Sequence, residues 1–421
     1  MKKLEDSQKK IFDKIKNKII LNKNTSELNI FRYLSNSNKF SFAQMQFILN
    51  KKNLISYFFF NLKNFFSFFF FYDYKVYKSK IKNKYKRVII SWGKFEDFDK
   101  NGTFFDRYIG ENSNSKSKNL WVIQYDGKSL PKKLDKNIFI LKKSEKKTLY
   151  LKYLLRILKE SKLTNLFENF SYNSLYAFVF DDLITTNLKK LNFKEIIIPY
   201  EGQIFQKYLI RKLKKKNLKI TGLVHTFPQP IPFNLFFDKY SCPNKLTVNS
   251  KSLKNCLIKN MQWKKKDVLI KKSKRFDRNS KFDMKKKIFF PYEIPNQNKL
   301  LMVFKEFVDL YKNKINFDFD VKIHPVKFED LSYKNLKEKI IKIINQNNFK
   351  KSKNSQNISI FFEYTSSLIE ALERDVKVFQ LCTEPILQVY TSKFFDGIRT
   401  IPITNNIIEY KKIKKNTLIK M

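Results

Sequence analysis

The chain has 421 residues, enough for two or three domains, and its 43% hydrophobic content with 44 phenylalanines excludes wholesale disorder. The net charge of +48 would ordinarily indicate a nucleic-acid partner. However, the 86 basic residues are mostly lysines mixed with acids over the whole length, and arginine, which makes the best bidentate phosphate contacts, is scarce. We therefore expect a solvated basic surface with no specific nucleic-acid partner, and a secondary attraction to anionic membranes.

The numbers and spacing of cysteine and histidine residues limit the cell compartments and the metal sites to be expected. The three cysteines have no CxxC spacing, and with only two histidines the chain shows neither a zinc-finger pattern nor a disulfide framework. The residues Met1–Asp6 lack the apolar stretch of a signal peptide. We expect a cytoplasmic protein, able to lie peripherally at the inner face of the cytoplasmic membrane.

Residues 1–84 form the first region, which is expected to be a helical, aromatic-rich extension. It contains two intensely aromatic runs, 53–62 and 64–72, separated by Lys63. Each run is shorter than the roughly 20 residues of a membrane-spanning helix, and a lysine at mid-bilayer is costly. A buried helical segment is the favoured interpretation, a helix lying in the membrane interface is the first alternative, and a true membrane span is the second.

From Tyr85 the pattern changes to apolar strands alternating with amphipathic stretches, which is typical of a parallel sheet with crossover helices. Residues 85–280 are expected to form one Rossmann-like domain, with helices at 147–163 and 202–216. The expected strands are Arg87–Ser91, Leu120–Tyr125, Asn137–Leu141, Tyr176–Phe180, Glu195–Pro199, Lys219–Val224, Lys245–Val248 and Asp267–Ile270.

A charged, turn-rich segment at 271–287 interrupts this pattern, and a second βα series follows within residues 281–421. We predict an α/β protein with two facing Rossmann-like, doubly wound domains and a cleft between them. Neither series carries a GxGxxG fingerprint, which argues against a dinucleotide oxidoreductase. The expected elements of the second series are Lys287–Phe290, Asn298–Lys314, Phe319–Ile323, Leu331–Asn345, Ile358–Phe362, Ser366–Glu373 and Val376–Leu381.

Ligands of open α/β sheets bind beyond the carboxyl ends of the strands, so the residues that follow each strand are the first candidates for a site. Glu201 follows the strand Glu195–Pro199 and precedes Gly202 and Gln203, where a helix begins. A carboxylate there can act as a general base. It can equally be an acid favoured by the helix dipole. Gly202 favours the functional interpretation, because the chain has only seven glycines.

Both histidines follow apolar, strand-like runs. His225 and Thr226 begin a loop stiffened by three prolines, which suits recognition of a polar substrate. His324 precedes Pro325, which keeps the histidine out of the helical region and at the sheet edge, where its imidazole can donate to a phosphate. The alternative for each is a structural histidine satisfied by backbone hydrogen bonds.

Two further sequences follow expected strands. Ser366, Ser367 and Glu370 lie at a helix start, where free backbone amides favour an anion and the carboxylate can reach a ribose hydroxyl. Ser367-x-x-Glu370 is also a capping box, and the two interpretations are compatible. Asp181 and Asp182 form a possible metal-holding pair, which we rank below an ordinary helix cap.

The order of these motifs, Glu-Gly, then His-Pro, then Ser-Ser-x-x-Glu, resembles bacterial surface-polysaccharide glycosyltransferases of the GT-B type, particularly the sialyltransferase and polysialyltransferase group. Residues 101–110 and 200–232 look like the surface carbohydrate biosynthesis proteins of O-antigen and capsule loci. The resemblance covers about residues 85–400. It implies an acceptor domain over 85–280 and a nucleotide-sugar domain over 281–421.

The resemblance implies a role for some of the candidates. Glu201 matches the carboxylate of the family's acidic-Gly motif, which implies a general base, and His324 with Pro325 matches its HP motif, which binds the nucleotide phosphate and assists its departure. Ser366 and Ser367 match its phosphate-facing serine/threonine motif. Tyr200 stands where sialyltransferases often have a second acid, so the resemblance does not imply a CMP-activated donor. Gln203 and His225 receive no role from the comparison.

The sequence therefore predicts an inverting glycosyltransferase that needs neither a metal nor a cofactor besides its nucleotide-sugar donor and acts on a glycan or lipid-linked acceptor. A nucleotide-sugar epimerase of the same architecture is one alternative, and it would form product from the donor alone. A basic nucleic-acid-binding protein is another, and its binding would depend steeply on salt. A scaffold that has kept the fold and lost activity is the third.

Overall fold

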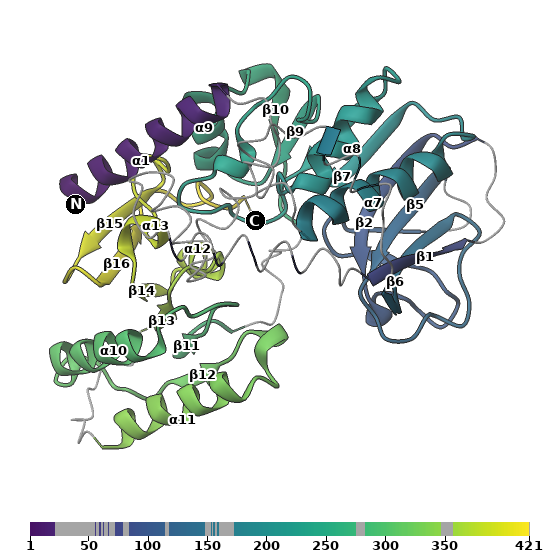
Figure 1. The fold of residues 1–421 in the computed structure, drawn as a ribbon. Coiled ribbons are helices and arrows are strands. Elements are labelled where there is room, and N and C mark those ends of the chain that lie inside the picture. The colour runs from purple at the N-terminus through teal and green to yellow at the C-terminus, as the bar shows by residue number, and fades with distance from the viewer. Residues whose placement is uncertain are drawn as a thin grey trace.

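A computed structural model of the protein describes residues 1–21, 72–78, 84–113, 118–147, 172–274, 283–346 and 357–420, together with isolated positions at 55–66 and 153–159. Two sheets organise the described residues, an eight-stranded sheet with order β1-β6-β5-β2-β7-β8-β9-β10 and a six-stranded sheet with order β12-β11-β13-β14-β16-β15. Helices lie against both sheets (Figure 1). The predicted α/β class with two doubly wound sheets is confirmed.

The first sheet is parallel from β6 to β10, and only the edge strand β1 runs antiparallel, to β6. The short hairpin β3–β4 is not part of this sheet. The elements of this half are β1 (Tyr72–Lys78), β2 (Arg87–Gly93), β3 (Phe105–Asp106), β4 (Glu111–Asn112), β5 (Asn119–Tyr125), β6 (Ile138–Lys147), α7 (Tyr172–Leu188), β7 (Glu195–Pro199), α8 (Ile204–Lys214), β8 (Lys219–Leu223), β9 (Lys245–Val248), α9 (Lys251–Lys259) and β10 (Val268–Ile270).

The two faces of this sheet are covered by different elements. The helices α7 and α8 pack against each other and, with α9, bury one face in the largest hydrophobic cluster of the described residues. Over β2, β5 and β6 the opposite face is covered by the segment around Phe98 and Phe104, which packs on Trp121. This second cover includes the hairpin β3–β4.

The second sheet begins with four parallel strands, to which β16 and then β15 are added antiparallel. α10 packs on α11 and β14, and α12 packs on β14 and β16. Its elements are β11 (Lys287–Phe289), α10 (Gln297–Tyr311), β12 (Asp320–Lys322), α11 (Leu331–Asn345), β13 (Ile358–Phe362), α12 (Ser367–Glu373), β14 (Lys377–Leu381), α13 (Pro385–Gln388), β15 (Ile398–Pro402) and β16 (Ile407–Lys412).

The N-terminal helix α1 (Lys2–Leu21) packs against α13 in the second half of the chain (Figure 1). The buried Phe12 ring lies 5.4 Å from the rings of both Phe233, which follows β8, and Phe394, which follows α13. The Gln8 amide nitrogen donates to the Val389 carbonyl at 2.7 Å. Because Phe12 contacts residues of both halves, α1 joins them.

The C-terminal end of the chain returns to the first half. Both the Ser250 hydroxyl and the Ser252 amide donate to the Thr417 carbonyl at 3.0 Å. The amide of Lys420 donates to the carbonyl of Asn249, which directly follows β9. The loops at the carboxyl end of β9 are therefore fixed by contacts from the last residues of the chain.

Most predicted elements are confirmed, some of them to the residue, such as β7, β9, α11 and β13. The strand predicted at Tyr176–Phe180 is wrong, because these residues belong to α7. This helix is buried over much of its surface, so its apolar run lacks the helical period that would distinguish it from a strand. Strands β15 and β16 were not predicted, and the predicted helix at 147–163 lies largely outside the described residues.

The expected helical extension holds for α1 but is wrong for residues 72–78, which form the edge strand β1. The aromatic runs at 53–72 lie largely outside the described residues. Ile55, Phe59 and Phe66 are described, helical and each more than half exposed, which contradicts burial at these positions. No helix in the described part of the chain is long and apolar enough to span a membrane.

Candidate functional site

The turn after β7 places Glu201 at the carboxyl end of a central strand of the first sheet. Gly202 adopts a left-handed φ of +66°, and a Cβ added there would lie 1.9 Å from the Asn234 carbonyl oxygen. Only glycine fits this backbone without a shift. The Asn234 side chain donates to the Glu201 carbonyl at 2.6 Å, so the turn is held from the loop after β8.

The buried Gln206 fixes the same turn from α8. Its carboxamide oxygen accepts the backbone N–H groups of Glu201 at 3.0 Å and Gln203 at 3.1 Å, and its nitrogen donates to the Pro199 carbonyl at 2.7 Å. One side chain therefore satisfies the polar groups of the strand end and of the helix start. Gln206 was not predicted as a site residue, although a glutamine three residues after an N-cap is a recognised capping signal.

The carboxylate of Glu201 lies between two candidates predicted from the sequence. The Gln203 side chain donates to Oε2 at 2.5 Å, and Nε2 of His225 lies 3.5 Å from Oε1. The His225 side chain is only 4% exposed, and the Tyr108 ring packs edge-on against it at 4.3 Å between centroids. Glu201 is 36% exposed, so its position is fixed while its surface stays accessible.

A cavity of about 180 Å³ adjoins this carboxylate. It is lined by residues of the first half, including Glu201, Thr226 and Gln229, and by Tyr364, which follows β13 in the second sheet. Burial, and to a smaller extent the charge of Glu201, raise the pKa of Tyr364 above its ordinary value. The Tyr390 hydroxyl, also from the second half, donates to the Pro228 carbonyl at 2.8 Å. The cavity thus lies where loops of the two halves meet.

His324 lies at the end of β12, an edge strand of the second sheet. Its Nδ1 accepts the Val326 amide at 3.3 Å, which leaves the proton on Nε2. Burial lowers the pKa of His324, which favours the neutral ring. Pro325 begins the short 3-10 turn Pro325–Lys327. No hydrogen bond or ion pair joins His324 to Glu201 among the described residues, and the two catalytic candidates follow strands of different sheets.

Ser366 and Ser367 lie at the start of α12, as predicted. Ser366 is the N-cap residue but its side chain makes no capping hydrogen bond, and the Thr365 hydroxyl accepts the Ser367 amide at 3.3 Å. Glu370 forms an ion pair with Arg374 at 2.8 Å. The capping box expected between Ser367 and Glu370 is therefore not formed, and the Glu370 carboxylate faces Arg374.

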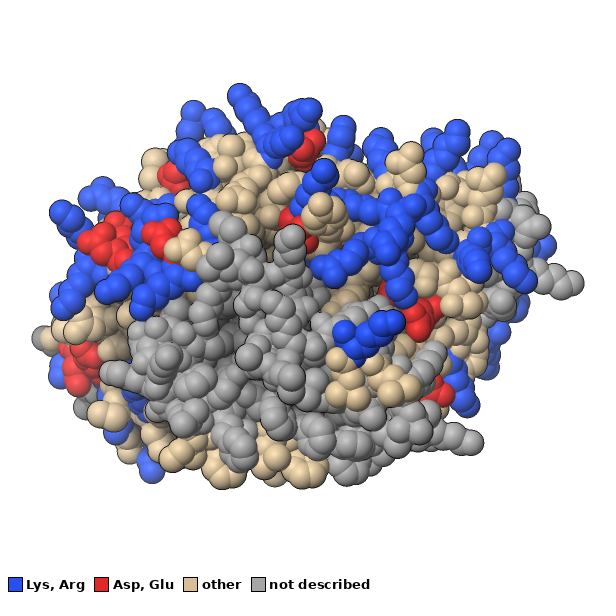
Figure 2. Space-filling model, turned by 45° about the horizontal axis from the view of Figure 1, so that its top comes forward, with Lys and Arg blue, Asp and Glu red and all other residues tan. Residues whose placement is uncertain are grey.

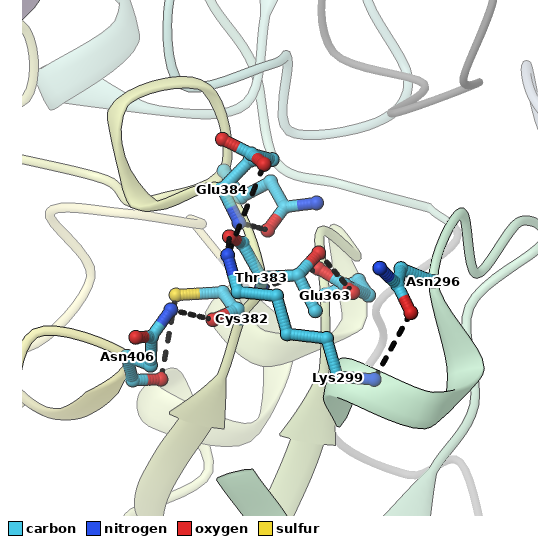
Figure 3. Close-up of polar contacts among 8 residues, drawn as sticks. Asn296, Lys299, Glu363, Cys382, Thr383, Glu384 and Asn406 are labelled. Carbon is cyan, nitrogen blue, oxygen red and sulfur yellow. Dashed lines mark hydrogen bonds and ion pairs between the residues drawn. The ribbon is translucent and has the colours of Figure 1, made fainter. Parts of the chain in front are cut away.

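A polar cluster that the sequence analysis missed lies at the carboxyl ends of β13 and β14 (Figure 3). Glu363 has a left-handed φ of +50°, and its carboxylate accepts the Thr383 hydroxyl at 2.7 Å and the Thr383 amide at 3.1 Å. Lys299, in the first turn of α10, donates to the Thr383 carbonyl at 2.6 Å and lies 3.9 Å from Glu384. Asn296 caps the same helix.

Burial dominates the electrostatics of this cluster. It raises the pKa of Glu363 to about 7, although the hydrogen bonds from Thr383 oppose the shift. Burial also raises the pKa of Glu384, and Lys299 opposes that shift. A carboxyl group with a pKa near neutrality at the carboxyl end of a strand can donate or accept a proton. The sequence offered a reason to consider Glu363 as a site residue, because it directly follows an apolar strand.

Asp181 and Asp182 form neither a metal site nor a helix cap. They lie inside α7, where both carboxylates form ion pairs with Lys212 of α8. Asp182 also accepts the Tyr153 hydroxyl at 2.9 Å. The sequence predicted a strand before these two acids, whereas the segment is a helix, so the interpretation of the acids as residues at the end of a strand was also wrong. Among the described residues no three potential ligands gather into a metal-holding group.

Comparison with known proteins adds little to this geometry. No protein-family model and no curated protein matches the chain. Among solved structures, the chain is similar to a glycosyltransferase from Rickettsia africae ESF-5, with 14% identity, a TM-score of 0.30, and coverage of 70% of this chain and 79% of that one. A similarity this low assigns no function to this chain.

Proposed function

We propose that the protein is an inverting glycosyltransferase, with a GT-B-like arrangement and no metal requirement. In this proposal it moves a sugar from a nucleotide-sugar donor to a surface-polysaccharide or lipid-linked acceptor. The observation that carries the proposal is Glu201, a fixed and accessible carboxylate at the carboxyl end of β7, bordering a cavity lined by both halves of the chain. Ligands of α/β sheets bind at such strand ends.

The chemical step would use this carboxylate as the general base. A hydroxyl of the acceptor enters the cavity and transfers its proton to Glu201 as its oxygen bonds to the anomeric carbon of the donor. The bond from that carbon to the phosphate oxygen breaks, and its electron pair leaves with the nucleotide phosphate. His225 and Gln203, which contact the two carboxylate oxygens, would keep the carboxylate in one orientation for this transfer.

The departing phosphate would be stabilised from the second sheet. The Nε2–H of His324 can donate to a phosphate oxygen, because its Nδ1 accepts the Val326 amide. Other groups lie at the same edge of this sheet, at the carboxyl ends of further strands. They are the serines Ser366 and Ser367, which follow β13, and Lys299, in the helix that follows β11. Pro325 holds His324 at that edge, while Thr226 lines the acceptor side of the cavity.

The same proposal places the protein at a membrane surface when the acceptor is lipid-linked. Figure 2 shows lysine and arginine side chains spread over the described surface of one face, with fewer acids between them. The exposed apolar positions Ile55, Phe59 and Phe66 would enter the interface, and the lysines would contact anionic headgroups.

Substitution of Glu201 by glutamine tests the proposal. Nucleotide release from CMP-, UDP-, GDP- and dTDP-linked sugars is measured with a lipid-linked oligosaccharide fraction as acceptor. Glu201→Gln should lower the rate by about 10²-fold or more, since it removes the general base, and leave donor affinity within about threefold. Glu195→Gln, at the opposite end of β7, is the matched control and should keep its rate. Unchanged release by Glu201→Gln would refute the assignment.

A further inference from the structure

A second cavity, of about 240 Å³, lies on the other side of His225. Its floor is formed by strands β7, β8 and β9, and its cover by the hairpin β3–β4 and the segment after β10. The two cavities share Val224 in their walls, and His225, which borders this one, contacts Glu201, which borders the other. Its lining includes Thr221, Leu223, Thr247, Asn249, Lys271 and Lys274.

The floor of this cavity lies where a doubly wound sheet is normally covered. In β7 and β8 the residues facing the other way, such as Ile196 and Ile220, are buried, whereas Ile197, Thr221 and Leu223 are only half-buried. These strands lie inside the eight-stranded sheet, not at its edge. Sheets of this kind bury both faces, so an open floor beneath a hairpin is a feature that needs a reason.

Asn249 supplies an independent observation. It lines the cavity at the end of β9 and is only 4% exposed, yet neither its amide nitrogen nor its amide oxygen has a hydrogen-bond partner in the part of the chain that the structure describes. Burying an amide that makes no hydrogen bond costs free energy of folding. A ligand that both accepts from and donates to this side chain would recover that cost.

The charge at the cavity is positive. Lys271, Lys272 and Lys274 border it, are exposed, and form no ion pair with any described acid. Arg87, by contrast, is paired with Glu111 of the hairpin. The three lysines therefore form an unneutralised group beside the neutral polar floor. An anionic group of a ligand would be attracted to that side.

Within the cover, the backbone of Gly110 lies close to the side-chain stem of Lys274. Gly110, in the hairpin β3–β4, has a left-handed φ of +72°, and a Cβ there would lie 3.0 Å from Cγ of Lys274. The hairpin and the lysine segment thus pack against each other over the cavity. The volume is below the roughly 300–1,000 Å³ of pockets for drug-sized ligands, so one small ring is the largest group that fits.

We propose that this second cavity binds a ligand of one sugar ring that carries a single carboxylate or phosphate group. Asn249 would bind neighbouring hydroxyls of the ring, using its nitrogen as donor and its oxygen as acceptor. The hydroxyls of Thr221 and Thr247 would contact the ring from the floor, and the lysines would hold the anionic group. The inference goes beyond the proposed transferase function and does not depend on it.

Calorimetric titration of the full-length protein tests this site with glucose 6-phosphate, glucuronate, glucose and inorganic phosphate. One or both charged sugars should bind at least about tenfold more tightly than glucose or inorganic phosphate, because only they use both the amide and the lysines. The two charged sugars distinguish a phosphate from a carboxylate ligand. Equal affinity for all four, or no binding of either charged sugar, would overturn the proposal.

Variants distinguish binding in this cavity from a general electrostatic attraction to the basic surface. Asn249→Ala and the pair Lys271→Ala/Lys272→Ala should each weaken the charged sugar by about tenfold. The pair Lys265→Ala/Lys266→Ala removes the same charge outside the cavity and should change affinity by less than about twofold. An equal loss in both lysine pairs, or full affinity in Asn249→Ala, would refute the assignment.

Two further variants address a misfolded Asn249→Ala variant and the independence of this cavity from the proposed transferase site. Thr221→Val changes one floor hydroxyl without changing size, so if Asn249→Ala does not fold, weaker binding by Thr221→Val still supports the site and unchanged binding refutes it. Glu201→Gln should keep the affinity for the charged sugar within about twofold, because Glu201 does not line this cavity. A failure of the transferase proposal would therefore leave this result intact.

Discussion

Replacing the buried Glu363 by glutamine should change how the stability of the protein depends on pH. Burial raises the pKa of this carboxyl group to about 7 in the folded protein, against an ordinary value of 4.5. The folded state therefore holds a proton that the unfolded chain releases at lower pH. The free energy of unfolding should fall as the pH rises from about 4.5 to about 7, and then level off.

The magnitude follows from the two pKa values. They differ by about 2.5, and a difference of one corresponds to about 1.4 kcal/mol, so the parent protein should lose about 3 kcal/mol across this range through Glu363. Glutamine is neutral at every pH and can still accept the Thr383 amide and bond the Thr383 hydroxyl. The variant should match the parent near pH 4.5 and be more stable by about 3 kcal/mol at pH 8.

Urea denaturation at pH 4.5, 6, 7 and 8, followed by circular dichroism, measures this difference. Glu338→Gln, which replaces an exposed acid on α11, is the control and should keep the pH dependence of the parent. If Glu363→Gln is no more stable than the parent at pH 8, the Glu363 carboxyl is not protonated in the folded protein, and the argument from burial is wrong.

Three other substitutions test the fold around the site. Gly202→Ala should destabilise the protein by more than about 1–2 kcal/mol and lower nucleotide release, because the left-handed turn and the Asn234 carbonyl leave no room for a Cβ; thermal unfolding of the variant measures this. Lys212→Ala should cost about 3 kcal/mol in urea denaturation, because it removes the cation from the buried Asp181, and a loss below about 1 kcal/mol would contradict that ion pair's importance. Phe12→Ala should cost about 3–5 kcal/mol if α1 joins the two halves, and unchanged resistance to proteolysis would show that it does not.

Much of the fold could be predicted from the sequence, because most strands are short apolar runs bounded by turn residues. β7 and β13 are such runs, and their bounds were predicted to the residue. The prediction failed for α7, because a helix buried on most sides loses its polar period. It also failed for β1, whose pairing with β6 depends on residues about seventy positions away.

The site was predictable only in part, for a related reason. Glu201 and His225 follow neighbouring strands, so the rule that ligands bind at strand ends selected both, but not the 3.5 Å contact between them. The contact between Glu363 and Thr383 depends on the pairing of β13 with β14, which no local pattern encodes. The unsatisfied amide of Asn249 depends on which distant parts of the chain surround the end of β9, and the local sequence gives no signal for it.

The central claim, that the protein binds a nucleotide-sugar donor, is tested most directly by thermal unfolding in the presence of CMP, UDP, GDP or dTDP at two salt concentrations. One nucleotide should raise the melting temperature selectively at both salt concentrations, with or without magnesium, and His324→Ala should abolish the shift. No response, or an equal response to all four that salt removes, would contradict the claim and favour a basic nucleic-acid-binding protein.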